Sequence, residues 1–379
     1  MLKKSNKLKL IKALSFGTEQ TENYILHGDN HIILQELLET EIKGKVSCVY
    51  IDPPYNNNER YFHYADDFGH DKWISDLTDR ISLLFELLSK DGSLWISIDD
   101  TEVHYLKVAI DNLLGRNKFI TTIVWQHRTT RENRVAFSNN HEYILVYAKN
   151  PSIFSNKRNL VPLTEEVKSR YKNPDNDPRG PWQSISVNVQ AGHAAKSQFY
   201  TVVAPSGKKH TPPNGRCWAY NEERMLKEIE LGNIWFGSDG QGVPRRKKFM
   251  YEGKQGLTPE TLWLADEVST TKAAKKQILK LFKDEPVFDT PKPEQLIHKI
   301  LSIASNEGEL ILDAYLGSGT TAAVAHKMKR KYIGIEQGEH AVSHCADRLR
   351  RVIDGESSGV SKLADWEGGG GFKFLTLNT

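Results

Sequence analysis

Short apolar runs alternate with segments of helical periodicity over the first 150 residues of the chain. The runs have the length of buried strands and fall at 24–26, 46–51, 94–98, 120–125 and 143–148. Apolar positions three and four residues apart predict helices between them, around 32–38, 77–88 and 103–113. This alternation predicts a mostly parallel sheet with helices on both faces.

The same order returns near the carboxyl end of the chain after a long interruption. Prolines, glycines and Asn/Asp pairs break every periodicity from 151 to about 285, which indicates a separate, loop-rich module. Beyond it, Pro293 suits the first turn of a helix, and strands are predicted at 309–313 and 332–336, each before a helix. A glycine-rich tail then leads to a short edge strand. We therefore divide the chain into 1–150, 151–285 and 286–379.

Composition and charge fit a globular protein and exclude several classes. The 379 residues are 39% hydrophobic and 26% charged, and no uncharged apolar run is long enough to span a membrane. Three cysteines, far apart, exclude a disulfide framework and a four-cysteine zinc site, and the lysine-rich start lacks the apolar stretch of a secretory signal. These features predict a cytoplasmic protein. The net charge is +3, but residues 151–270 hold 17 Lys and Arg against 13 Asp and Glu, a weak indication of a polyanionic partner.

A glycine turn between a strand and a helix is the first candidate site. Asp313 ends the strand at 309–313, and Gly317 and Gly319 follow it, where the absence of side chains lets a ligand approach the backbone. The next helix offers free N–H groups at its start. Glu336 ends the next strand, where a carboxylate can accept both hydroxyls of a ribose. The pattern favours a nucleoside-type cofactor over a turn that needs glycines only for packing, and it leaves the cofactor open.

The second candidate site is Asp52-Pro53-Pro54-Tyr55, directly after the strand at 46–51. This position lies at the carboxyl edge of the sheet, where open α/β folds bind ligands. The two prolines fix the turn and lack N–H groups, so a carboxylate, a carbonyl and an aromatic ring remain for a ligand. Asp52 and the Pro53 carbonyl can accept the two N–H bonds of an exocyclic amino group, and Tyr55 can stack on the ring that carries it. The alternative is a strand-ending turn with a capping Asp.

Together the two sites resemble those of the S-adenosylmethionine-dependent amino-methyltransferases of DNA. Asp52-Pro53-Pro54-Tyr55 resembles the catalytic motif of the adenine-N6 members, and the segment 313–321 resembles their methionine-binding loop. The catalytic motif precedes the cofactor loop, as in the circularly permuted β class. Nearly the whole chain resembles the methylation (Mod) subunits of type III restriction-modification systems, and the finer matches lie at 27–30, 95–100, 123–126, 140–143 and 288–293.

The resemblance implies a fold, a cofactor and a set of site residues. The fold is an α/β, doubly wound, mostly parallel, seven-stranded methyltransferase (Rossmann-like) sheet, circularly permuted, with the middle segment inserted as a target-recognition module. The cofactor is S-adenosyl-L-methionine, and no metal is expected. The residues implied to hold the cofactor are Asp29, Thr290, Lys292, Pro293, Asp313, Tyr315, Gly317, Ser318, Gly319, Thr320 and Glu336. Those implied at the flipped-out target base are Asp52, Pro53, Pro54 and Tyr55.

The resemblance also implies double-stranded DNA as the substrate. Arg245, Arg246, Lys247 and Lys248 would contact phosphate, or else belong to a solvated surface loop. His141 either lies near the flipped base or is a satisfied histidine at the start of a strand. A homodimer and a restriction (Res-type) subunit stay open as further partners, and no membrane is expected.

The reaction places simple demands on the site. The exocyclic nitrogen of adenine is a weak nucleophile because its lone pair is delocalised into the ring. When protein groups accept hydrogen bonds from its two N–H groups, the lone pair becomes free for direct attack on the sulfonium methyl. Neither a metal nor a covalent intermediate is then needed. The nitrogen is buried in the duplex, so the base must first be flipped out. Asp52 then serves as an acceptor and positioning group more than as a strong base.

Three other functions compete with adenine methylation. A nicotinamide-dependent oxidoreductase would use Gly317 and Glu336, but it leaves the motif at 52–55 unexplained and little chain after Glu336. Cytosine-N4 methyltransferases act on the same kind of amino group, but more often carry Ser in place of Asp52, which favours adenine. A DNA-binding module that has lost catalysis is disfavoured by the intact motif. The sequence leaves the recognition site and the number of methylated strands open.

Overall fold

The computed structural model describes residues 7–57, 69–282 and 290–378, which form two compact units. One unit comprises Met1–Asn159 with Pro259–Thr379, and the other comprises Leu160–Thr258. The inserted unit is therefore shorter than the 151–285 segment expected from composition, because the flanking residues pack with the larger unit. Residues 288 and 289 of the motif at 288–293 lie outside the described residues.

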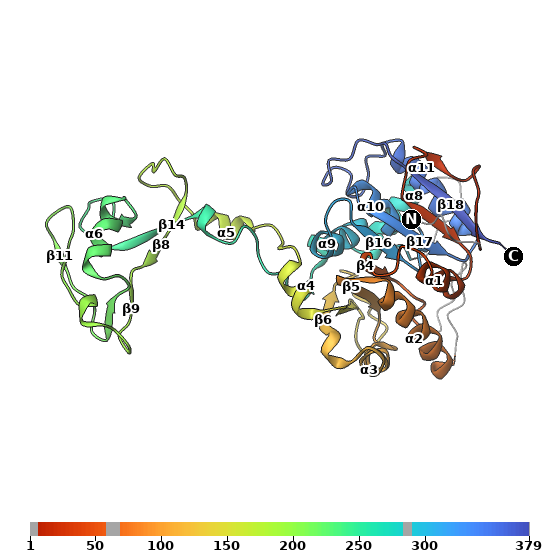
Figure 1. Ribbon diagram of the computed structural model, residues 1–379, viewed down its shortest axis with the longest axis horizontal. Coiled ribbons are helices and arrows are strands. Elements are labelled where there is room, and N and C mark those ends of the chain that lie inside the picture. Colours follow the sequence, from red (N-terminus) through yellow and green to blue (C-terminus); the bar gives the residue numbers. More distant parts are fainter. Residues whose placement is uncertain (1–6, 58–68, 283–289, 379) are drawn as a thin grey trace. The chain divides into compact units, whose positions relative to one another are not determined.

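An eleven-stranded, mostly parallel sheet is the frame of the larger unit (Figure 1). Its centre has the order β3-β17-β16-β4-β5-β7-β6, and these are the seven strands that the apolar runs predict. Their bounds are β3 (Tyr24–His27), β17 (Lys331–Glu336), β16 (Leu310–Asp313), β4 (Val46–Ile51), β5 (Leu88–Ile98), β7 (Glu142–Ala148) and β6 (Phe119–Trp125). The sheet is wider than seven strands because β1 (Leu8–Leu10), β2 (Phe16–Gly17), β15 (Leu262–Trp263) and β18 (Gly371–Leu377) extend it. The circular permutation expected from the motif order stays a prediction.

Helices cover both faces of this sheet, as the doubly wound pattern requires. Figure 1 shows α1 (Asn30–Leu38), α2 (His70–Leu87) and α3 (Val103–Leu114) along one side and α9 (Glu294–Ala304), α10 (Thr320–Lys327) and α11 (Asp347–Ile353) along the other. Alternate strand residues serve the two faces: Val49 and Ile51 of β4 join the core under α1–α3, whereas Tyr50 between them does not. Further helices of this unit are α4 (Pro151–Lys157), α7 (Ala265–Val268) and α8 (Thr271–Leu281).

The carboxyl-terminal strand differs from the sequence expectation. The glycine-rich tail predicts a short edge strand, but β18 lies inside the sheet, between β3 and β1. It runs parallel to β3, and it pairs on its other side with β1 and β2. The three residues of β1 and two of β2 are too few to produce a recognisable strand pattern, so the partner that closes this edge is invisible in the sequence.

The topology brings five chain segments to one edge of the sheet. The parallel strands β4, β5, β16 and β17 all end there, which places Asp52, Asp313 and Glu336 at neighbouring strand ends. Strand β7 is antiparallel to β5, so it begins at this edge, with Tyr143 opposite Ile98. The segment 140–143 therefore joins the carboxylates of the other strands.

The inserted unit has its own small core. Three short antiparallel sheets pair β13 (Ile234–Trp235) with β14 (Arg245–Phe249) and β8 (Trp182–Ser186), β9 (Asn188–Gln190) with β12 (Arg216–Trp218), and β10 (Val202–Val203) with β11 (Lys209–His210). Two helices, α5 (Glu165–Ser169) and α6 (Glu222–Glu230), complete it. Trp218, Met225 and Phe236 are buried in its core. Short elements around a few large side chains explain why no periodicity is visible here.

Two further predictions can be compared with the described residues. None of the helices there is long and apolar enough to cross a membrane. All three cysteines are buried and free, so none belongs to a disulfide.

Candidate active site

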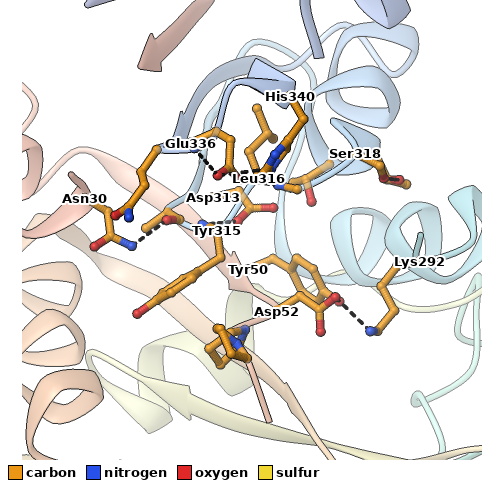
Figure 2. A pocket seen from close by; sticks show the side chains of 18 of the residues that line it. Asn30, Tyr50, Asp52, Lys292, Asp313, Tyr315, Leu316, Ser318, Glu336 and His340 are labelled. Atoms are coloured by element: carbon orange, nitrogen blue, oxygen red, sulfur yellow. Dashed lines mark hydrogen bonds and ion pairs between the residues drawn. The ribbon is translucent and has the colours of Figure 1, made fainter. Parts of the chain in front are cut away.

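A cavity of about 560 Å³ lies at the carboxyl edge of β4, β16 and β17 (Figure 2). Asp52 stands on one side of it, and Asp313 and Glu336 stand on another (Figure 2). The two candidate sites of the sequence therefore share one cavity. A volume of this size suits a ligand as large as a nucleoside with a substituent.

The glycine turn after β16 is held in a conformation that other residues adopt at a cost. Gly317 and Gly319 have φ values of +54° and +79°. A Cβ atom on Gly319 would lie 3.2 Å from the Cα of Cys345, and the Cys345 thiol donates to the Gly317 carbonyl at 3.0 Å. Gly319 is also the residue before α10, so the turn ends at a helix N-terminus. Packing against the π-helix Ala341–Ala346 thus fixes the shape of the cavity wall.

Glu336 ties the end of β17 to this turn. Its Oε2 accepts the Gly317 N–H at 2.8 Å, and its Oε1 accepts the Gly338 N–H at 2.9 Å and lies 3.1 Å from His340 Nε2. Burial raises the pKa of Glu336, but the hydrogen bonds from His340 and from the two N–H groups outweigh it, and the pKa lies below its ordinary value. Glu336 is therefore an ionised acceptor in the cavity wall at neutral pH.

Asp313 lies deeper and has the opposite shift. Its side chain is buried, and its Oδ1 accepts the Tyr315 N–H at 2.9 Å. Burial raises the pKa of Asp313 to about 7, although the hydrogen bonds from Thr321 and the Tyr315 backbone counter the shift. Asp313 can thus gain or lose a proton near neutral pH.

Asp52 belongs to a compact cluster of charged and polar side chains. Its Oδ1 accepts the Tyr55 hydroxyl at 2.9 Å, and its Oδ2 accepts Lys292 Nζ at 2.7 Å (Figure 2). The Tyr55 hydroxyl also lies 3.0 Å from Glu142 Oε2, and Lys292 Nζ lies 3.7 Å from the same oxygen. One phenol and one ammonium group thus join two carboxylates, and Lys292 is only 9% exposed.

The cluster has a net negative charge. His127 Nδ1 lies 3.6 Å from Glu142 Oε1. Burial lowers the pKa of His127 more than Glu142 raises it, so the imidazole is neutral at neutral pH. Counted at formal charge, the two carboxylates of Asp52 and Glu142 exceed the single ammonium group of Lys292 by one negative charge, which suits a ligand that carries or develops a positive one.

The turn after Asp52 is fixed from outside. The Trp73 indole N–H donates to the Pro54 carbonyl at 2.8 Å. Asn56, with φ +57°, donates from Nδ2 to the buried Glu102 at 2.8 Å. These contacts hold the Pro53-Pro54 segment against α2 and the start of α3, so the Asp52 carboxylate faces the cavity in a rigid frame.

The comparison with protein families decides what kind of protein carries this site. The family model described as "DNA methylase" (N6_N4_Mtase) matches residues 46–347, which contain every residue of the Asp52 cluster and of the glycine turn. The chain belongs to the DNA methylase family. Family membership favours methyl transfer over the nicotinamide-dependent oxidoreductase.

Curated relatives of this chain are named as Mod subunits of type III restriction-modification enzymes or as type II methyltransferases. The chain is 33% identical over 335 residues to the type III restriction-modification enzyme StyLTI Mod subunit of Salmonella typhimurium, covering 80% of this chain and 50% of that protein. It is 29% identical to the probable HindVI Mod subunit of Haemophilus influenzae, covering 97% of this chain and 55% of the other. It is 30% identical to the type II methyltransferase M.KpnI of Klebsiella pneumoniae, covering 81% of this chain and 77% of that protein. The chain thus spans about half the length of the two Mod subunits.

Most of the predicted site residues of the methylase lie on the cavity wall. These are Asp52, Pro53, Pro54, Thr290, Lys292, Asp313, Tyr315, Gly317, Ser318, Thr320 and Glu336. Tyr55 and Gly319 do not line it, but each bonds to a residue that does. The Tyr55 hydroxyl donates to Asp52, and the Gly319 N–H donates to the Leu316 carbonyl. Pro293 is buried directly before α9, one residue outside the helix that it was expected to start.

Asp29 lies beside the cavity rather than on its wall, and its predicted contact with the cofactor stays a prediction. Its carboxylate accepts the Ile32 N–H at the start of α1 and lies 3.7 Å from Arg80. The neighbouring Asn30 lines the cavity instead, donating to the Ala314 carbonyl at 2.9 Å. Asp29 therefore caps a helix beside the cavity, and Asn30 and Arg80 form the wall there.

The basic run 245–248 forms strand β14 of the inserted unit, and its members differ in exposure. Lys247 is 7% exposed and forms ion pairs with Asp175 and Asp177. This residue is thus not available to phosphate, contrary to expectation, because the strand alternation turns it inward. Arg245 donates to the Ser184 carbonyl, Arg246 pairs with Glu252, and Lys248 is partly exposed.

His141 is partnered at the start of β7. Its Nε2 lies 2.9 Å from the Tyr143 hydroxyl, which donates to Asp100 at 2.7 Å. It is next to Glu142, whose role the sequence does not indicate although it lies within the motif at 140–143. The contact of Glu142 with Tyr55 joins residues that are 87 positions apart, so no local sequence pattern predicts it. Within the described residues, no group of His, Cys, Asp and Glu is arranged to hold a metal ion.

Proposed function

We propose that the chain is a site-specific DNA methyltransferase that transfers the methyl group of S-adenosyl-L-methionine to the N6 amino group of a flipped-out adenine. The observation that carries this proposal is the shared cavity: Asp52 and Glu336 face one space of about 560 Å³. Asp52 can accept hydrogen bonds from the amino group of a base, and Glu336 can accept those of a nucleoside cofactor. Both ligands would thus be bound in one cavity, as direct methyl transfer from one to the other requires.

The residues of the wall fit the proposed cofactor. Glu336 is an ionised acceptor for ribose hydroxyls. The glycine turn before α10 has no side chains at Gly317 and Gly319, so a ligand can approach the protein backbone there. Asp313, when ionised, is an acceptor for the ammonium group of a methionine portion. S-Adenosyl-L-methionine, when bound, supplies an electrophilic methyl group on a sulfonium ion. No other chemical group is needed, so the protein has to bind, orient and stabilise charge.

The Asp52 cluster would prepare the target nitrogen. Asp52 and the Pro53 carbonyl accept the two N–H bonds of the amino group, which frees the nitrogen lone pair. Lys292 and Tyr55 hold the Asp52 carboxylate in place. As the methyl group is transferred, the nitrogen becomes cationic, and the net negative charge of Asp52, Glu142 and Lys292 stabilises it. The proton that the product nitrogen must lose then has a carboxylate as its first acceptor.

Adenine is favoured over cytosine as the target. Both bases present an exocyclic amino group, so the acceptors alone do not separate them. The residue at the head of the motif is Asp52, as in the adenine-N6 members that the sequence resembles, rather than the Ser of many cytosine-N4 members.

The inserted unit, residues 160–258, would read the target sequence. Double-stranded DNA is the substrate, and Arg245, Arg246 and Lys248 are the members of the basic run that remain for phosphate. The named Mod relatives make a restriction (Res-type) subunit a candidate partner, beside a homodimer. A DNA substrate and the lack of a membrane-spanning helix in the described residues agree with a cytoplasmic enzyme.

Expression in a host that lacks DNA methylation tests the proposal. Single-molecule sequencing of the host DNA should find N6-methyladenine at one recurrent short sequence. N4-methylcytosine instead would show that the target base is cytosine rather than adenine. Methylation of one strand only would favour a function like that of the type III relatives. Soluble protein that binds S-adenosylmethionine and leaves the DNA unmodified would contradict the proposal.

Asp52→Ala is the matched variant. We expect it to abolish methylation and to keep cofactor affinity within about twofold, because Asp52 faces the base rather than the cofactor. Calorimetric titration with S-adenosylmethionine measures the second quantity. Equal loss of both would mean that Asp52 maintains the cavity rather than binding the base.

A further inference from the structure

The loop that joins β6 to β7, residues 126–141, is built onto the Asp52 cluster. At its start, His127 Nδ1 lies 3.6 Å from Glu142 Oε1, and Glu142 directly follows its end. Glu142 in turn lies 3.0 Å from the Tyr55 hydroxyl. Both ends of the β6–β7 loop are therefore fixed beside the place where a flipped base would be held.

The tip of this loop exposes apolar side chains. Phe137 is 92% exposed, the highest value for any large hydrophobic residue in the described parts of the chain, and Val135 is 53% exposed. Single exposed apolar residues are common on proteins. A phenyl ring almost fully in water, on a loop that begins at the active site, is a more specific feature.

The loop is not an extended, unsupported segment. The Glu132 N–H donates to the Ser138 hydroxyl at 2.9 Å, and Ser138 donates to Asn140 Oδ1 at 2.5 Å. Asn140 Nδ2 donates to the Arg128 carbonyl at 3.1 Å. These bonds close the loop across its base, and Phe137 and Val135 stay exposed at its tip.

Charge identifies the partner that fits this surface. Arg128, Arg131 and Arg134 lie on the loop with one acidic residue, Glu132, so the loop is positive. The Arg134 side chain is 93% exposed, and Arg128 is 42% exposed. An aromatic ring among arginines suits stacked bases between two rows of phosphate, and it does not suit an apolar protein surface.

We propose that the β6–β7 loop enters duplex DNA and that Phe137 occupies the space left in the base stack by the flipped-out adenine. This inference rests on the proposed function, and it adds a second DNA-contacting element outside the inserted unit. A base that leaves the stack loses its stacking partners, and the neighbouring pairs are left with a gap. A flat, apolar ring in that gap restores stacking and keeps the base from returning. Arg128, Arg131 and Arg134 hold the loop at the adjacent phosphates.

Two duplexes with the recognition sequence test this role. In one, the target adenine faces thymine; in the other, it faces an abasic site, which removes the pairing that flipping must break. For Phe137→Ala on the paired duplex, we expect single-turnover methylation to slow about tenfold or more, because unpairing and unstacking cost a few kcal/mol. On the abasic duplex the variant should come within about threefold of the wild-type rate. Phe137→Trp keeps a flat ring and should restore the rate on both.

A fluorescent base measures flipping without methyl transfer. With 2-aminopurine in place of the target adenine, the wild type should raise the fluorescence on binding, and Phe137→Ala should not. Leu363→Ala, which removes another exposed side chain of the larger unit (65% exposed), is the control and should behave as wild type. Calorimetric titration of Phe137→Ala with S-adenosylmethionine should give the wild-type affinity.

Three outcomes would overturn the inference. The first is a wild-type methylation rate for Phe137→Ala on the paired duplex. The second is a rate that this variant loses equally on both duplexes. The third is a rise in 2-aminopurine fluorescence with Phe137→Ala that equals the rise with the wild type. A wild-type chain that flips 2-aminopurine but transfers no methyl group would instead contradict the proposed function alone.

Discussion

At the scale of single residues, Glu142 is the group whose role the sequence left open. It shares the Tyr55 hydroxyl and the Lys292 ammonium with Asp52, so its charge acts on the same target nitrogen. For Glu142→Gln, we expect kcat to fall by about 10- to 100-fold, because one negative charge beside a nitrogen that becomes cationic is lost. Cofactor affinity should stay unchanged, since Glu142 does not line the cavity.

Rapid-quench kinetics on the paired duplex measure this effect. Glu86→Gln provides the matched control, because Glu86 is a half-exposed partner of Lys43 in the same unit, and such pairs contribute little. A Glu142→Gln enzyme with normal kcat and weakened DNA binding would assign Glu142 to binding rather than to the transfer step.

Asp313 gives the active site a predictable dependence on pH. Burial raises its pKa to about 7, so it is mostly protonated at pH 6 and mostly ionised at pH 8. If the ionised form accepts the cofactor's ammonium group, the dissociation constant of S-adenosylmethionine should fall with rising pH, about tenfold per unit below pH 7, and level off above it. It should rise again above about pH 8, where the α-ammonium group of the ligand loses its own proton. Calorimetry between pH 5.5 and about 8.5 measures the curve, a range set by the ordinary titration span of such a group.

The Asp313→Asn variant separates this origin from others. It should bind the cofactor weakly, with a dissociation constant that hardly changes across the same range. A pH dependence that survives in this variant would have to arise from another group of the site.

At the scale of elements, the glycine turn between β16 and α10 allows a direct test. Gly319 and Gly308 both have φ +79°, so alanine at either position costs about 1 kcal/mol of stability through backbone strain. Only at Gly319 would the new Cβ meet the backbone of Cys345, at 3.2 Å, whereas nothing lies within 4 Å at Gly308. Gly319→Ala should therefore lose cofactor affinity by tenfold or more, about 1.4 kcal/mol, whereas Gly308→Ala should not.

Thermal unfolding and calorimetric titration of the two variants are to be compared directly. Equal melting points with unequal affinities would assign the loss to the shape of the turn. Equal affinities would mean that the turn can shift against Cys345 without affecting the cavity.

The elements also mark how far the sequence can be read. Buried strands of the central sheet are evident from their apolar runs, and strand ends predict that Asp52, Asp313 and Glu336 meet, because parallel strands share one carboxyl edge. The pairing of Lys292 with Asp52 spans 240 residues and depends on how the segment before α9 lies. No periodicity carries that information. Short pairs such as β1 with β18, and the inward turn of Lys247, depend on tertiary packing in the same way.

At the scale of the whole molecule, the chain folds into two compact units, and the basic strand β14 tests the DNA-reading role proposed for the inserted one. Arg245→Ala with Arg246→Ala should weaken DNA binding and reduce the slope of log K against log salt by up to about 2, because each phosphate contact contributes about 0.9.

Lys247 offers the contrast within the same strand. It is buried against Asp175 and Asp177, so Lys247→Met should destabilise the inserted unit by about 1 to 3 kcal/mol. Each carboxylate loses a charged partner, although Asp177 keeps Arg179 and Asp175 keeps the Trp182 indole N–H. Binding isotherms between 50 and about 200 mM salt, the range over which phosphate contacts are most visible, and urea unfolding distinguish the two effects. If the double variant keeps the wild-type slope, the phosphate contacts lie elsewhere, and the β6–β7 loop with Arg128, Arg131 and Arg134 becomes the next surface to change.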